Sequence, residues 1–127
     1  MPYITNIEEA TLENDNFRKV LFTTERSQLV VMSLLPGEEI GMEVHPDIDQ
    51  FIRFEDGEGQ VILDGVETAV KTEDAVVIPA GTEHNVVNTS SSTKLKLYTI
   101  YTPPEHVDGV IHETKADAEG DEHEHHH

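Results

Sequence analysis

The residues best suited to chemistry in this chain are two histidines, one carboxylate and one amide, all on segments of strand-like composition. Glu43 and His45 are two residues apart, so on a strand their side chains share one face. Gln50 begins the next expected strand, and His84 stands on a later one, after a Pro-Ala-Gly turn at 79–81. Two imidazoles, one carboxylate and one amide oxygen suit a divalent ion such as zinc, iron, manganese or nickel. The sequence therefore predicts one divalent metal ion held by Glu43, His45, Gln50 and His84 inside the fold.

Some of these assignments have alternatives in the sequence. Asp49 competes with Gln50 for the fourth position, and Gln50 could instead hydrogen-bond to a ligand from outside the metal shell. Asp47, two residues after His45, would form a facial triad with the distant His84, although Pro46 suggests that Asp47 lies in a loop. Among the expected ligands, Glu43 is the candidate catalytic residue, because its carboxylate could pass a proton to or from a substrate.

The composition limits the class of protein. The chain has 127 residues, enough for one domain with a real core, and no cysteine, so disulfides and thiolate metal sites are ruled out. A net charge of −18 argues against nucleic acid and anionic membranes as partners of this acidic protein. No apolar run is long enough to span a bilayer, and the N-terminus lacks the pattern of a signal peptide, so we expect a cytoplasmic location.

Short runs rich in Val, Ile, Leu, Thr, Tyr and Phe alternate with turn residues, a pattern typical of β-strands. Asp64-Gly65 between two such runs favours a type I′ hairpin. We expect an all-β sandwich or barrel without an internal helix; Pro2 to Ile7 is a possible further strand and Leu12 to Asn16 a loop. The predicted strands are Phe17 to Thr24, Ser27 to Leu35, Ile40 to His45, Gln50 to Glu55, Gln60 to Leu63, Glu67 to Lys71, Ala75 to Ile78, His84 to Asn88 and Lys94 to Thr102.

The pattern changes after Pro103-Pro104. We therefore expect a single barrel domain over residues 1–104 and an acidic, His-rich, flexible tail over 105–127 that is too poor in large apolar residues to order itself. His106 and His112 are expected at the surface of this tail. The last histidines, at 123 and 125–127, either belong to the natural chain or remain from a purification tag, and they could bind metal adventitiously.

The two segments with candidate ligands resemble the two motifs of the cupin superfamily, from about Val30 to Thr102. In the first motif, Glu43 stands where the family has its first histidine and His45 matches the second. Gln50 replaces a glutamate, with six residues between it and Gly57. The exchange keeps one carboxylate in the set, so the formal charge of the site survives.

The second motif matches more closely. Its Pro-x-Gly turn is present at 79–81, and His84 and Asn88 follow at the family's spacing, while Glu73 replaces the leading glycine. The resemblance implies a cupin-type double-stranded β-helix, or jelly-roll, barrel with an internal metal ion.

The Glu-x-His and Gln pattern is similar to single-domain cupins loosely described as mannose-6-phosphate-isomerase-like. This resemblance implies isomerase-like or dioxygenase-like chemistry on a small oxygenated molecule such as a sugar derivative or a diketone. The alternative is a module that binds or senses a small ligand without turnover. Because such barrels often pair through exposed sheet edges or faces, we also expect a homodimer.

Overall fold

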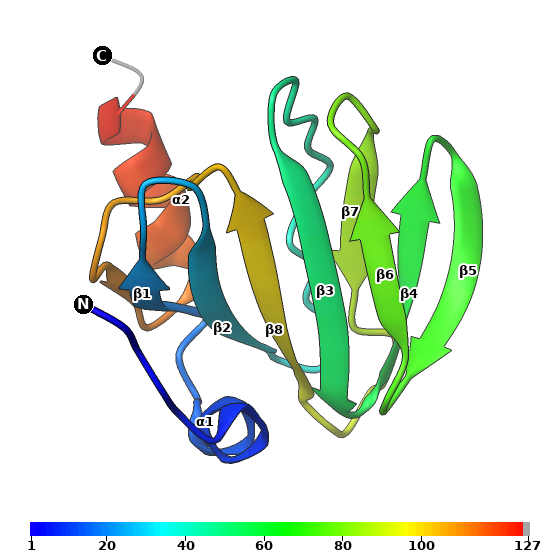
Figure 1. Cartoon of the computed structure of the whole chain (residues 1–127). Coiled ribbons are helices and arrows are strands. Elements are labelled where there is room, and N and C mark those ends of the chain that lie inside the picture. The colour runs from blue at the N-terminus through cyan, green and yellow to red at the C-terminus, as the bar shows by residue number, and fades with distance from the viewer. Residues whose placement is uncertain (126–127) are drawn as a thin grey trace.

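Two antiparallel sheets face each other in the computed structural model, which describes residues 1–125 and the side chains of residues 1–121 (Figure 1). The larger sheet has the strand order β6-β3-β8-β2-β1-β9, and the smaller has the order β5-β4-β7. This arrangement confirms the prediction of an all-β fold. The strands are β1 (Arg18–Thr23), β2 (Gln28–Leu34), β3 (Asp49–Asp56), β4 (Glu58–Leu63), β5 (Val66–Lys71), β6 (Ala75–Ile78), β7 (His84–Val87), β8 (Leu95–Thr102) and β9 (Ile111–His112). The helices are α1 (Ile7–Glu13) and α2 (Lys115–His125).

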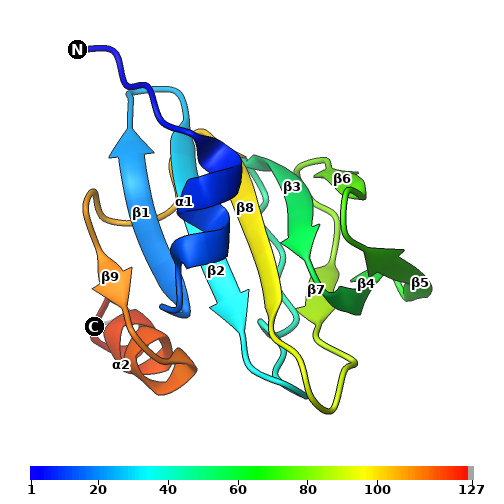
Figure 2. The same cartoon turned by 90° about the horizontal axis from the view of Figure 1, so that it is seen from below.

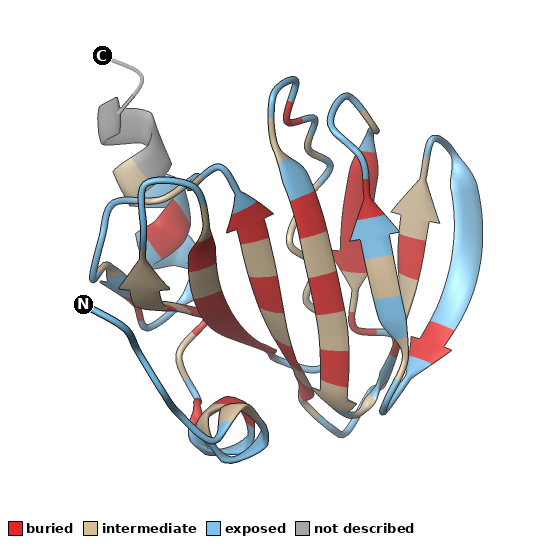
Figure 3. Ribbon diagram, in the orientation of Figure 1, coloured by how far each residue is buried: buried red, intermediate tan, exposed pale blue. Residues whose placement is uncertain are grey.

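The core lies between the two sheets and follows the period-2 pattern of the strands. Along β3, Gln50, Ile52 and Phe54 are buried while the residues between them are partly exposed, and this alternation is visible in Figure 3. Ile52 and Phe54 are fully buried, and burial of each such side chain contributes roughly 1.5–3 kcal/mol. Gln50 therefore sits on the core-facing side of a strand whose position is fixed by apolar packing.

Two local features fix the hairpin that joins β4 and β5. Asp64 and Gly65 both have positive φ, 48° and 84°, which confirms the predicted type I′ turn. Near the start of β4, a Cβ atom added to Gly59 would collide with the carbonyl oxygen of Val87. Glycine at this position allows β4 to approach the end of β7 closely.

The predicted strand Ile40 to His45 is an irregular segment rather than a regular strand. It runs antiparallel to β7 through isolated bridges, one of which pairs Glu43 with His84. Glu43 N donates to His84 O at 2.8 Å, and His84 N donates to Glu43 O at 2.9 Å. The segment departs from regular geometry at Gly41, whose φ is 112°, so only part of the ladder forms.

The N-terminal prediction was wrong. Instead of a strand over Pro2 to Ile7 and a loop over Leu12 to Asn16, the chain forms α1, which lies against the outer face of β2, β3 and β8 (Figure 2). The Asn6 side chain caps the helix by accepting a hydrogen bond from Glu9 N at 3.0 Å. Acidic Glu8 and Glu9 in the first turn favour the helix further.

The expectation of a flexible tail from residue 105 does not hold for residues 105–121. Within this part, β9 pairs with β1, and α2 begins beside it and buries Ala118. The order comes largely from backbone hydrogen bonds, such as Phe17 N to Glu113 O and Val20 N to Val110 O, which the polar composition does not reveal. Residues 126 and 127 lie outside the described residues.

A reciprocal cap also starts α2. Thr114 Oγ1 accepts from Asp117 N, and Asp117 Oδ2 accepts from Thr114 N. Among the described residues, no helix combines the length and the apolar character needed to cross a membrane.

Candidate functional site

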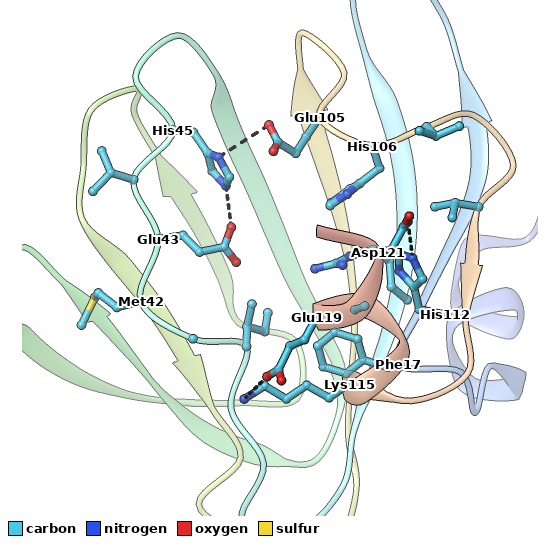
Figure 4. A pocket seen from close by; sticks show the side chains of 17 residues that line it. Phe17, Met42, Glu43, His45, Glu105, His106, His112, Lys115, Glu119 and Asp121 are labelled. Atoms are coloured by element: carbon cyan, nitrogen blue, oxygen red, sulfur yellow. Dashed lines mark hydrogen bonds and ion pairs between the residues drawn. The ribbon is translucent and has the colours of Figure 1, made fainter. Parts of the chain in front are cut away.

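Hydrogen bonds to β7 place the segment that carries Glu43 and His45. The Asn85 side chain accepts from Gly41 N at 2.8 Å and donates to the Glu39 carboxylate at 3.2 Å. His45 O accepts from Gly81 N at 2.9 Å, so the turn after β6 holds the far end of the segment. Glu43 and His45 then project to the same side, as their spacing predicted (Figure 4).

Glu43 and His45 form an ion pair, with 3.2 Å between Glu43 Oε2 and His45 Nε2. Burial opposes ionisation of Glu43, but the hydrogen bond from His45 and the charges of His45, Arg18 and His84 outweigh it, so the pKa of the carboxyl lies below its ordinary 4.5. The hydrogen bond to Glu43 raises the pKa of His45 above 6.5, against the effect of burial. Without a metal ion, a proton on His45 therefore balances the charge of Glu43.

His84 comes next to this pair from β7. Its ring centroid is 5.2 Å from that of His45, and its side chain is buried. His84 Nδ1 lies 2.8 Å from Thr82 O, so it donates its proton there and Nε2 keeps the free lone pair. This is the tautomer that a metal ligand needs.

Gln50 is buried on β3, and its two amide atoms differ in their partners. Nε2 donates to Thr99 Oγ1 at 3.0 Å, whereas Oε1 is buried without any hydrogen-bond partner. Asp49, its competitor in the sequence, is exposed and accepts a hydrogen bond from Ala80 N at 2.9 Å. Asp47 lies exposed in a turn. Gln50 is thus the side chain that faces the interior, and its unpaired oxygen can coordinate a metal ion or accept a hydrogen bond.

A cavity of about 550 Å³ opens beside Glu43 and His45. Of the four predicted ligands, these two line it, whereas Gln50 and His84 do not. Tyr101 lies in register with Gln50 and presents its ring to His45, with 6.1 Å between the centroids. Tyr98 and Tyr101 have opposite parity along β8, so their side chains point to opposite faces of the sheet, and the buried one is Tyr101.

Sequence reasoning missed the opposite wall of the cavity. Figure 4 shows Glu43 and His45 on one side and His106, His112 and Asp121 on the other. The expectation that His106 and His112 are surface residues was wrong, since His106 is half-buried and His112 is buried. Both follow the predicted barrel in sequence and return to it only because β9 pairs with β1. No local sequence signal indicates that long-range pairing.

Glu105 is a further residue that sequence reasoning did not single out. Its Oε2 lies 3.6 Å from His45 Nδ1, on the side of the ring opposite Glu43. His45 is therefore oriented by a carboxylate at each ring nitrogen. This arrangement resembles the carboxylate support that metal-binding histidines commonly have.

The chemistry of the four side chains fits a divalent ion, although in this structure they do not yet lie close enough together to coordinate one. Within the described part of the chain, no three His, Cys, Asp or Glu side chains are grouped closely enough to hold a metal. The amide of Gln50 would complete the set, and its buried oxygen has no other partner. The present contact between His45 Nε2 and Glu43 Oε2 occupies the lone pairs that an ion would use.

Comparisons with known proteins agree on one family. The model of the cupin domain matches residues 30–101. The uncharacterized protein YrkC of Bacillus subtilis is 48% identical over 123 residues, which cover 92% of this chain and 66% of YrkC. The uncharacterized protein L612 of Acanthamoeba polyphaga mimivirus is 47% identical over 113 residues, 86% of this chain and 70% of L612. The chain thus spans about two thirds of the length of these curated relatives.

Among solved structures, a crystal structure of BH2720 from Bacillus halodurans has the same fold throughout. Its TM-score is 0.92 at 44% identity, and the match covers 94% of this chain and 95% of that one. The match extends well beyond the cupin motifs.

Proposed function

The chain belongs to the cupin family, and from this premise we propose that it binds one divalent metal ion inside the barrel and acts on a small oxygenated molecule. The proposed ligands are Glu43, His45, Gln50 and His84. The observation that carries the proposal is the buried Gln50 Oε1, which has no hydrogen-bond partner. Gln50 lies in register with Tyr101, whose ring centroid is 6.1 Å from that of His45. A buried acceptor left unpaired costs about 1–3 kcal/mol, and a bound cation would remove that cost.

The chain's own residues prepare the site for such an ion. Thr82 O fixes His84 as a donor at Nδ1, which leaves Nε2 available. Glu105 stands beside His45 Nδ1 and can hold the ring when Nε2 turns from Glu43 to a metal. Because the pKa of Glu43 is lowered, the carboxylate is ionised at neutral pH and ready to bind a cation.

A bound divalent ion would supply Lewis-acid polarisation of a substrate carbonyl or, if it is iron, redox chemistry with oxygen. Glu43 lines the cavity and is the group able to accept a proton from a substrate at its Oε2 atom. Tyr101 and the apolar core beneath it keep water from the inner side of the site. These roles support isomerase-like or dioxygenase-like chemistry on a sugar derivative or a diketone.

Elemental analysis of the purified protein tests the metal proposal. The four terminal histidines at 123 and 125–127 are first replaced by alanine, which removes adventitious ligands. We expect close to one divalent ion per chain, lost in His84→Ala and in Glu43→Gln. The matched control is Glu67→Gln, which alters an exposed carboxylate on β5 and should keep the ion. A metal content near zero in the parent protein, after growth with each candidate metal, would eliminate the proposed site.

Turnover assays with sugar phosphates and diketones then separate an enzyme from a binding module. Product formation that depends on Glu43 supports the enzyme. Saturable binding of the same compounds without product supports the alternative, a non-catalytic module.

A further inference from the structure

A buried arginine without an ion-pair partner among the described residues lies in the wall of the cavity, with its guanidinium carbon 5.3 Å from the centroid of the Phe17 ring. Arg18 begins β1 and is only 3% exposed, and its Nε and Nη1 atoms are buried without a hydrogen-bond partner. Among the described residues, no carboxylate lies within 4.0 Å of its guanidinium. A fully charged group removed from water is costly unless it is paired, so a core-facing arginine of this kind calls for an anion.

Two histidines next to Arg18 also present unpaired nitrogen atoms. His112 lies directly opposite Arg18 in the pairing of β1 with β9. Asp121 holds His112 Nε2 at 2.8 Å, while His112 Nδ1 and His106 Nε2 are buried without partners. All three side chains line the cavity. One wall of the cavity therefore carries several buried nitrogen atoms without a hydrogen-bond partner, and those of Arg18 are donors.

Burial and the charges of Arg18, His112 and His45 lower the pKa of His106 to about 3. The ring is therefore neutral at physiological pH, so it can donate one hydrogen bond without adding charge. Arg18 brings a full positive charge to this wall, and Glu43 and Glu105 line the same cavity.

We propose that Arg18 binds the carboxylate of a small organic anion, with His106 as a hydrogen-bonding neighbour. The proposal rests on the proposed function, because it names the substrate class: an oxygenated molecule whose carboxylate lies on Arg18 and whose other end faces Glu43 and His45. The planar guanidinium matches the two oxygens of a carboxylate. A cavity of about 550 Å³ accommodates such a molecule.

The charges of the walls favour a carboxylate over a phosphate. Four carboxylates line the same cavity, at Glu43, Glu105, Glu119 and Asp121, against the cations Arg18 and Lys115. Lys115 Nζ lies 3.8 Å from Glu119 Oε1, so this cation is already paired. A monoanion is repelled less by these acidic groups than a phosphate with nearly two charges.

Calorimetric titration of the full chain, freed of metal by a chelator and then dialysed, tests the proposal. The probes are the monoanions pyruvate and glycolate, with neutral methyl pyruvate and inorganic phosphate for comparison. We expect both carboxylates to bind more tightly than methyl pyruvate and phosphate. Arg18→Met should weaken carboxylate binding about tenfold or more. Arg18→Lys keeps the positive charge but loses the planar guanidinium that donates two parallel hydrogen bonds, so it should bind with intermediate affinity. The matched control is Arg26→Met, an exposed arginine whose loss should leave binding unchanged.

A second readout distinguishes binding from a structural role. Without ligand, Arg18→Met should melt at the same temperature as the parent or higher, because it removes an uncompensated buried charge. Equal carboxylate affinity in Arg18→Met and the parent would overturn the proposal, as would tighter binding of phosphate than of pyruvate. Carboxylate binding weaker than about 10 mM in the parent would overturn it as well. If Arg18→Met does not fold, Arg18→Lys decides, and unchanged affinity in that variant counts against the proposal.

The metal content of the same preparations keeps the two proposals apart. Stoichiometric metal without carboxylate binding would refute the role of Arg18 and leave the metal site standing. Carboxylate binding that depends on Arg18, in a protein that never takes up metal, would refute the metal site and leave the role of Arg18 standing.

Discussion

The double variant Gln50→Met and Thr99→Val tests whether the buried Gln50 amide serves as a metal ligand or only as a structural group. In the present structure Gln50 Nε2 donates to Thr99 Oγ1, and Gln50 Oε1 has no partner. Removing both hydrogen-bonding partners together loses about 1 kcal/mol for the bond. It also removes an unpaired buried acceptor that costs about 1–3 kcal/mol. We therefore expect the metal-free double variant to be as stable as the parent or more stable, by up to about 2 kcal/mol.

The response to metal should change in the opposite direction. An ion at 100 times its dissociation constant stabilises the parent by about 2.7 kcal/mol, and loss of one ligand should reduce that gain. Chemical denaturation with and without the metal measures both quantities in one experiment. Thr99→Val alone is the matched control and should be destabilised by about 1–3 kcal/mol, because it leaves the whole Gln50 amide unpaired. A double variant that is less stable without metal, yet gains as much from it as the parent, would show that Gln50 is only a structural amide.

The remaining predictions concern pH, packing, the C-terminal segment and assembly. In metal-free protein the pair Glu43 and His45 should stabilise the fold fully between pH 4.5 and 6.5 and less on either side, because the pKa of Glu43 is lowered and that of His45 is raised. The difference in melting temperature between the parent and Glu43→Gln, measured against pH, should peak there, and a flat profile would contradict it. Gly59→Ala should destabilise by about 1–3 kcal/mol in urea, because its Cβ would collide with Val87 O. Gly120→Ala, in α2 with open space around it, should stabilise by up to about 1 kcal/mol, and no gain would count against a folded α2. Light scattering should give the mass of the predicted homodimer, and the mass of one chain would refute that prediction.

The strands were predictable because the side-chain period of two and the turn residues are local signals. The sequence placed β6 at its observed bounds, and Asp64-Gly65 predicted the turn after β4. Helix α1 was missed although Asn6, Glu8 and Glu9 are typical of a helix start, because the short apolar run before it suggested a strand. The competition between local signals was settled by packing against β8, which lies far along the chain.

The same difference between local and long-range signals decides which parts of the site were predictable. The spacing of Glu43 and His45 predicted that they share a face, and the structure pairs them. Arg18 and His112 could not be predicted as neighbours, because β9 has two residues and its pairing with β1 joins segments about ninety residues apart. Polar composition predicted a tail where backbone hydrogen bonds build a wall of the cavity. The metal assignment itself stays a prediction.

An anomalous-difference map from crystals grown with manganese or zinc tests the central claim most directly. If the buried donors exist to hold a cation, one strong peak should lie between His45 Nε2, His84 Nε2 and the oxygens of Glu43 and Gln50. A map with no peak there, and with His45 still bonded to Glu43 at saturating metal, would contradict the account.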